Sequence, residues 1–227
     1  MIKVLDSILL NDNVVQEFYK HYKETRFHKW LLNLLPEVEE CRNLKQDNPW
    51  HIYNCLDHIL HSVEQMNNQT KGLNHEERRM LAYTMFLHDM GKPECYLRRY
   101  SKLYKREVDS FFNHNKAGVQ IAQRVLPNLN FKSEDIEKIK LLIDEHDVFM
   151  FITLEDDGNK FHRVLSSELI DEMINKYNEV GDGLTLLNML IMVGKSDNMA
   201  QNPEMTGNSL MLINKMQNIV NDKSKAL

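Results

Sequence analysis

Apolar residues recur at intervals of three and four positions along most of this 227-residue chain. Met80, Thr84 and Leu87 fall at such intervals, and Leu186 and Leu190 repeat the spacing nearer the C-terminus. This period matches one face of an α-helix, whereas a half-buried strand would alternate every second residue. Gly and Pro, at eight and five residues, are too few for a turn-rich β fold, while Leu, Met, Glu and Lys are plentiful. The sequence therefore predicts an all-α helical bundle.

Turn and capping signals divide the chain into helical segments. Pro36 opens a short helical piece after residues 2–35, and Asn74 with Glu77 has the spacing of a capping box at a helix start. We expect further helices over approximately these ranges: 51–66, 74–88, 115–126, 133–146, 166–180, 186–197 and 208–220. The sequence shows no internal repeat, linker or low-complexity stretch. We therefore expect a single domain over residues 1–227, with residues 1–40 as an N-terminal helical extension.

Residues 93–113 depart from this pattern, because aromatic and apolar residues are interleaved there with Arg and Lys. We expect an extended excursion or a small β-hairpin near residues 95–112. Arg98, one of the basic residues of this segment, could contact a phosphorylated substrate. A solvated loop would account for the same composition.

The overall charge, the chain start and the cysteines narrow the class of protein. A net charge of −5 argues against a general nucleic-acid-binding surface and leaves room for a local basic patch. The first residues lack a charged head followed by a long apolar stretch, so we expect no signal peptide. The most apolar run, residues 184–193, is far shorter than the roughly 20 residues that span a bilayer. Three cysteines without CxxC spacing indicate reduced thiols, so we expect a cytoplasmic protein with no membrane partner.

His88 and Asp89 are adjacent at the end of an apolar helical run, shortly before Gly91. An imidazole beside a carboxylate fills a core poorly, but it can present one nitrogen and one oxygen ligand to a divalent metal. The dipeptide alone is a weak signal, because it arises often by chance. Its meaning depends on whether other segments supply partners.

Such partners lie on the apolar faces of other predicted helices or at their starts: His58, His114, His146 and Asp197. Any one of them alone is more simply read as a hydrogen-bonded core or surface residue. Burying all of them without partners would cost several kcal/mol each, whereas a shared metal would remove that cost. His61, one turn from His58, is an alternative ligand. We favour His58 because Asn54 and His51 precede it at helical spacing.

These side chains could hold one or two ions. One site with room for water would use His58, His88, Asp89 and Asp197. Adding His114 and His146, with Asp89 bridging, would make two sites. Imidazoles and carboxylates suit a divalent transition metal such as Mn, Fe, Co, Ni or Zn, and would also accept Mg. Two ions that share an oxygen ligand can generate a hydroxide nucleophile and hold the oxygens of a phosphoryl group.

Lys92 follows the predicted helix end by a few residues. Its ammonium group could stabilise a phosphate or the charge that develops in its transition state. The alternative is that Lys92 only pairs with the negative end of the helix dipole.

The pattern formed by His58, His88-Asp89 and Asp197 resembles the H…HD…D signature of the HD-domain metal-dependent phosphohydrolases. Further stretches are similar to the HD domain of bacterial CCA-adding tRNA nucleotidyltransferases, and they lie at residues 34–37, 50–58, 87–93, 111–114, 145–146 and 196–203. The resemblance covers roughly residues 30–203, with a metal-binding core at residues 48–203. It implies an all-α HD-domain bundle. The head of those nucleotidyltransferases, with its Gly-Ser and paired-aspartate signature, has no counterpart, so we do not expect nucleotide addition to tRNA.

The resemblance implies phosphodiesterase or phosphatase activity toward a nucleotide or another phosphoester. It implies the ligand set given above, with Asp89 and Lys92 as catalytic residues and His51 and Lys92 on the substrate side, where Arg98 of the basic segment would join them. The expected partner is a small phosphorylated molecule, foremost a nucleotide, with an RNA end as the alternative. Two other functions stay open: a di-iron oxygenase with the same ligands, and a non-catalytic nucleotide-binding regulatory module.

Overall fold

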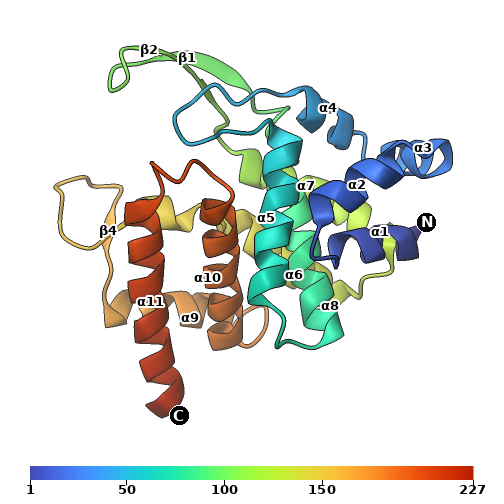
Figure 1. Ribbon diagram of the computed structural model, residues 1–227. Helices are drawn as coiled ribbons and strands as arrows, with labels where there is room; N and C mark the ends of the chain where they lie inside the picture. The colour runs from blue at the N-terminus through green and yellow to red at the C-terminus, as the bar shows by residue number, and fades with distance from the viewer. Residues whose placement is uncertain (227) are drawn as a thin grey trace.

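Helices make up most of residues 1–226, which the computed structural model describes (Figure 1). The α-helices within this range are α1 (Ile2–Leu9), α2 (Val14–Tyr22), α3 (Thr25–Leu34), α4 (Glu37–Asn43), α5 (Cys55–Gln69), α6 (His75–Leu87), α7 (His114–Val125), α8 (Ser133–Glu145), α9 (Ser167–Tyr177), α10 (Gly183–Met199) and α11 (Gly207–Ala226). Two 3₁₀ turns, η1 (Leu126–Leu129) and η2 (Val148–Phe151), follow α7 and α8. The predicted all-α bundle is confirmed.

The helices α5, α6 and α10 form the centre of the bundle. Helix α5 packs against both α6 and α10, while α7 packs against α8 and α10 packs against α9 and α11. Figure 1 shows α1 to α4 gathered on one side of α5 and the pair α9 and α11 on the other. The central helices are buried on most of their surface: Leu56, Leu60, Leu81, Leu87 and Leu187 are all inaccessible to solvent. This apolar burial is the main stabilising term of such a bundle.

Capping side chains fix where the central helices begin. The predicted capping box of α6 is present, because Asn74 accepts from the Glu77 amide and Glu77 accepts from the Asn74 amide. Helix α5 begins at Cys55, four residues later than the predicted start at His51. The side chain of Asn54 accepts from the backbone N–H of Asp57 and so ends the preceding loop. His51 therefore lies in that loop and not on a helix.

A hairpin of β1 (Leu97–Ser101) and β2 (Arg106–Ser110) interrupts the helices and extends beyond the bundle (Figure 1). The hairpin predicted near residues 95–112 is thus confirmed. Arg98 clamps its base to the turn before His51, since its guanidinium donates to Asp109 Oδ1 at 2.8 Å and to Asp47 Oδ2 at 2.9 Å. A second, short strand pair, β3 (Ile152–Thr153) with β4 (Arg163–Val164), is parallel and carries no clear sequence signal.

None of the helices within residues 1–226 combines the length and the apolar character needed to cross a bilayer.

Candidate metal centre

Two of the predicted histidines stand at the ends of helices in the same local geometry. His88 closes α6 and His146 closes α8, and both have helical backbone angles. The Nδ1 atom of His88 lies 2.6 Å from the carbonyl oxygen of Met85, and that of His146 lies 2.7 Å from the carbonyl oxygen of Ile143. A carbonyl oxygen can only accept, so each Nδ1 carries the proton. When the ring is neutral, its Nε2 atom is therefore left with a free lone pair.

The other two histidines come from the starts of α7 and α5 and follow the same rule. His114 Nδ1 lies 2.8 Å from the carbonyl oxygen of Phe111. His58 Nδ1 lies 3.3 Å from the carbonyl oxygen of Ala200, which follows α10. In Figure 1 the first turn of α5 and the last turn of α10 both lie at the hairpin end of the bundle. Backbone carbonyls thus orient all four imidazoles, as second-shell partners do around metal ligands.

Asp89 lies between two pairs of imidazoles and turns one oxygen toward each pair. Its Oδ2 atom is 3.2 Å from His58 Nε2 and 3.3 Å from His88 Nε2. Its Oδ1 atom is 3.1 Å from His114 Nε2 and 3.8 Å from His146 Nε2. Asp197 Oδ1 joins the first pair, at 2.9 Å from His58 Nε2 and 3.5 Å from His88 Nε2. The structure therefore brings together all six residues predicted as metal ligands.

The donor atoms of this cluster are buried and incompletely satisfied. The side chains of His58, His88 and Asp89 are at most 2% exposed. His58 Nε2, His88 Nε2 and Asp89 Oδ2 face one another without a well-directed hydrogen bond, although Lys92 Nζ forms an ion pair with Asp89 Oδ2. Leaving a buried imidazole nitrogen without a hydrogen bond costs about 1–3 kcal/mol. A divalent cation would satisfy all three at once, so this donor set fits a metal ion of the kind that binds imidazole and carboxylate.

The charges of the two carboxylates in the cluster favour binding of a cation. Burial raises the pKa of Asp89, but His88 and Lys92 outweigh it and hold this pKa well below its usual range. Burial likewise opposes ionisation of Asp197, and His58 and His88 keep its pKa well below the usual range. Burial lowers the pKa of His88, yet Asp89 and Asp197 raise it to about 10. Both carboxylates are therefore ionised, and a metal ion would compete with a proton for His88.

Lys92 and His51 border the cluster. Lys92 Nζ is 2.5 Å from Asp89 Oδ2, donates to Gln46 Oε1 at 2.8 Å and lies 3.2 Å from His51 Nε2. Burial lowers the pKa of Lys92, but Asp89 outweighs it and the pKa is raised, so the side chain is an ammonium ion. The His51 ring is centred 5.1 Å from that of His58, and burial followed by the charge of Lys92 holds its pKa well below the usual range. His51 is therefore neutral.

Arg98 and His61 have partners outside the cluster. Arg98 forms ion pairs with Asp47, Glu107 and Asp109. Its place is the base of the hairpin, and its contact with a substrate stays a prediction. His61 Nδ1 lies 3.1 Å from Glu64 Oε2 and its ring packs on Tyr53, so the cluster contains His58 and not the alternative ligand.

Asp147 belongs to the cluster and was missed by the sequence analysis. Its Oδ2 atom lies 3.4 Å from His114 Nε2, and its Oδ1 atom lies 3.5 Å from His146 Nε2. A usable signal was present in the sequence, because His146-Asp147 repeats the dipeptide His88-Asp89. The apolar spacing of its segment pointed to His146 only, since Asp147 falls one position off the buried face.

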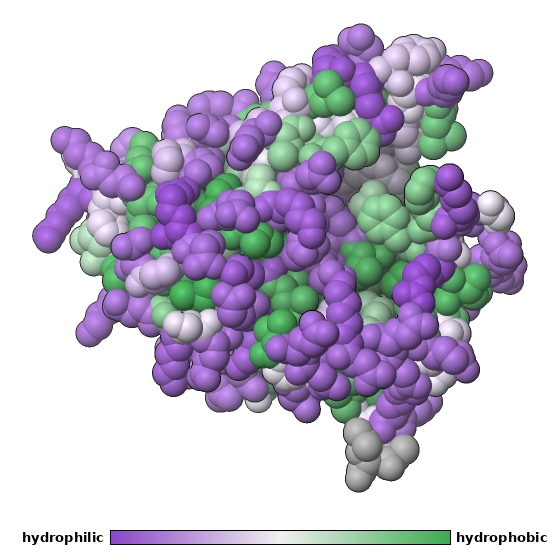
Figure 2. Space-filling view, turned by 180° about the vertical axis from the view of Figure 1, so that it is seen from behind, coloured by the Kyte–Doolittle hydropathy of each residue, from purple (hydrophilic) through white to green (hydrophobic). Residues whose placement is uncertain are grey.

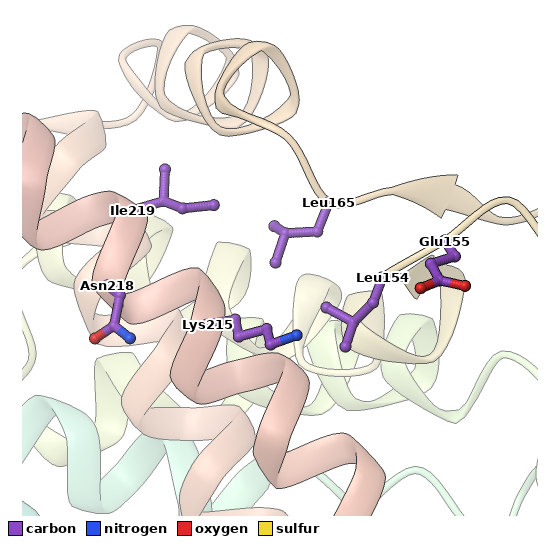
Figure 3. A pocket seen from close by; sticks show the side chains of 6 residues that line it. All are labelled: Leu154, Glu155, Leu165, Lys215, Asn218 and Ile219. Carbon is purple, nitrogen blue, oxygen red and sulfur yellow. The ribbon is translucent and has the colours of Figure 1, made fainter.

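The surface offers a hollow beside the hairpin and a separate pocket elsewhere. Figure 2 shows the hollow below the hairpin, which forms the upper right of that view, with apolar side chains at its border. The separate pocket, of about 420 Å³, lies between α11 and the segment around β3 and β4 (Figure 3). It is lined by Leu154, Glu155, Leu165, Lys215, Asn218 and Ile219, none of which belongs to the cluster.

Gly91 sets the distance between the His88-Asp89 segment and α7. A Cβ atom at this position would lie 2.3 Å from the carbonyl oxygen of His114 and 2.7 Å from the backbone nitrogen of Gly118. Both are backbone atoms, so Gly91→Ala must push α7 away. We expect it to lower the free energy of unfolding by about 2–3 kcal/mol, as overpacking does. The measurement is the midpoint of urea denaturation. Gly72→Ala is the control, since a Cβ there meets no described atom within 4 Å; equal midpoints for the two variants would contradict the close contact.

Comparison with known proteins yields a distant and partial relative. No family model matches the chain. A segment is 29% identical over 121 residues to the A-adding tRNA nucleotidyltransferase of Deinococcus radiodurans, which covers 51% of this chain and 25% of that protein. The chain therefore matches about a quarter of the length of this relative. Together, the relative and the buried His and Asp cluster indicate a metal-binding site.

Proposed function

We propose that this chain is a metal-dependent phosphohydrolase, a phosphodiesterase or phosphatase that acts on a nucleotide or another phosphoester. The observation that supports it best is the position of Asp89, which turns Oδ2 toward His58 and His88 and Oδ1 toward His114 and His146. A carboxylate placed in this way is suited to bridge two cations. Paired cations that share an oxygen ligand are typical of enzymes that displace groups at phosphorus.

The ligands of the first ion would be His58, His88, Asp89 and Asp197, and His114 and His146 would serve a second ion together with Asp89. When bound, divalent ions supply Lewis acidity to phosphoryl oxygens and lower the pKa of water. The buried, ionised carboxylates would hold these ions, and the backbone carbonyls at Nδ1 keep the imidazoles from rotating. Manganese, iron, cobalt, nickel and zinc all suit this donor set.

Lys92 and His51 would act on the substrate side of the same cluster. The Lys92 ammonium group is fixed by Gln46 and Asp89, so its charge is already oriented before a substrate arrives. Such a preorganised cation stabilises negative charge that develops on phosphoryl oxygens. His51 is neutral, and its Nδ1 atom lies 2.8 Å from Asn48 Oδ1, which orients the ring. Its Nε2 atom can then only accept, so it would position Lys92, which lies 3.2 Å away, or a hydroxyl group of the substrate such as that of a ribose.

The charge of the protein and its relative support the choice of substrate class. Because the protein has a net charge of −5, a small phosphorylated molecule is a better partner for it than a long nucleic acid. The relative is named as an A-adding tRNA nucleotidyltransferase, which favours a nucleotide, and an RNA end remains the second choice.

The test is turnover of phosphoesters by the full chain loaded in turn with Mn²⁺, Co²⁺, Ni²⁺, Zn²⁺ or Mg²⁺. The panel contains p-nitrophenyl phosphate, bis(p-nitrophenyl) phosphate, nucleoside monophosphates and cyclic nucleotides. We expect at least one ester to be hydrolysed, and Asp197→Asn to lose this activity. Absence of hydrolysis by metal-loaded protein would overturn the proposal. Oxygen consumption by the iron form would favour an oxygenase, and nucleotide binding without turnover would favour a regulatory module.

A further inference from the structure

The cluster contains two trios of ligands with the same composition. The first trio is His58, His88 and Asp197, and the second trio is His114, His146 and Asp147. In each trio, one imidazole nitrogen from each histidine and one carboxylate oxygen lie within 4.8 Å of one another. Asp89 stands between the trios and presents one oxygen to each. Asp147 thus holds the place in the second trio that Asp197 holds in the first.

A second observation at this trio points to a cation. The Nε2 atoms of His114 and His146 face each other at 3.1 Å. The Nδ1 atom of each ring is committed as a donor to a backbone carbonyl, of Phe111 and of Ile143. Since both Nδ1 atoms are already donors, the two Nε2 atoms can face each other at this distance without repulsion only if a proton or a metal ion lies between them. A positive ion held by both nitrogens removes this repulsion, and the carboxylate of Asp147, 3.4 and 3.5 Å from the two nitrogens, balances its charge.

We propose that Asp147 is a metal ligand, and that it completes a second site for a divalent transition-metal ion. The centre then holds two ions, each bound by two imidazoles, one carboxylate of its own and one oxygen of the shared Asp89. This inference rests on the metal centre proposed above and adds to it a further ligand for the second ion.

The two sites differ in their contact with solvent. The Asp197 side chain is 10% exposed, whereas the Asp147 side chain is 29% exposed. Carboxylates that are partly hydrated bind a cation less tightly, because water competes for it. The second site therefore binds its ion more weakly and exchanges it faster than the first.

The experiment is a calorimetric titration of the metal-free full chain with Mn²⁺ and with Co²⁺, and the cobalt form is also followed by its visible absorption. We expect two ions per wild-type chain. Asp147→Asn keeps the size of the side chain but removes its charge, so we expect the first ion to bind as in the wild type and the second at least about tenfold more weakly. Asp144→Asn is the matched control, because Asp144 lies in the last turn of α8, three residues before Asp147, and pairs with Lys116 on the surface. It should bind both ions.

Two results would overturn the inference: a single ion per wild-type chain, or undiminished binding of two ions by Asp147→Asn. Thermal unfolding of each metal-free variant shows whether it is folded, and since Asp147 is partly exposed we expect no loss of the fold. The result is separable from the proposed function. Two ions without hydrolysis of any phosphoester would leave Asp147 a ligand and reject the phosphohydrolase. Hydrolysis with a single bound ion would support the phosphohydrolase and reject Asp147 as a ligand.

Discussion

Asp89→Asn is expected to remove most of the bound metal and to lower kcat/KM for a phosphodiester at least about a thousandfold, about 4 kcal/mol in transition-state stabilisation. The side chain keeps its volume, so no cavity forms. One of its two oxygens becomes an NH₂ group, which donates and cannot bind a cation. Both pairs of imidazoles face this carboxylate at 3.1 to 3.8 Å, and the variant therefore affects both ions.

The measurements are the metal content after dialysis, by mass spectrometry, and turnover of bis(p-nitrophenyl) phosphate. Asp109→Asn is the matched control: its side chain is 4% exposed and pairs with Arg98, away from the cluster. It should lose stability but keep its metal. If Asp89→Asn retains wild-type metal and turnover, Asp89 is not a ligand and the proposed centre fails.

The helical architecture could be predicted from the sequence because it depends on local signals. The spacing of apolar residues and the Asn74 capping box locate α6 correctly, and the loss of helical spacing after Lys92 locates the hairpin. The start of α5 was placed four residues early because His51 has the spacing of a helical residue. What ends the loop is the side chain of Asn54, a cap that periodicity alone does not reveal.

Helical spacing predicts the ligands that lie on an apolar helical face, and the structure brings these together: His58, His88, His114, His146 and Asp197. Asp89 could be predicted only from its place beside His88. Asp147 lies outside any such face, and His51 reaches the cluster from a loop. Arg98 is a different case, since a basic residue in a sequence looks available to a substrate until its carboxylate partners are known, and its contact with a substrate stays a prediction. Those partners include Asp47, 51 positions away, a distance over which sequence spacing carries no information.

The structure also explains how the charge of Lys92 is accommodated in the interior. Lys92 is only 4% exposed, although a lysine just past a helix end is more often solvated. It is held by Asp89, Gln46 and His51, and its ammonium group lies 5.4 Å from the centre of the Phe111 ring. Burial of an ammonium ion is costly unless it is paired. Its partner Asp89 also faces the four imidazoles of the cluster, which is consistent with a role of Lys92 in stabilising negative charge on a substrate.

Lys92→Met is therefore expected to lower kcat about a hundredfold, about 2.7 kcal/mol, with a much smaller effect on KM. Met fills a similar volume and lies against Phe111 without a charge, so the variant removes the cation more than the packing. Metal content should stay at the wild-type value, because Asp89 keeps its charge and its imidazole neighbours. Lys92→Arg restores the charge but not the compact ammonium geometry, so we expect it to recover only part of the lost turnover.

The measurements are steady-state kinetics on the metal-loaded protein and metal content on the same samples. Lys102→Met, at an exposed position of the hairpin, is the control for loss of one positive charge and should leave kcat unchanged. Thermal unfolding with metal bound separates a catalytic loss from a folding loss. A fall in metal content in parallel with kcat would show that Lys92 acts by positioning Asp89. A rise in KM at constant kcat would show that its charge binds substrate and transition state equally, and would reject a catalytic role.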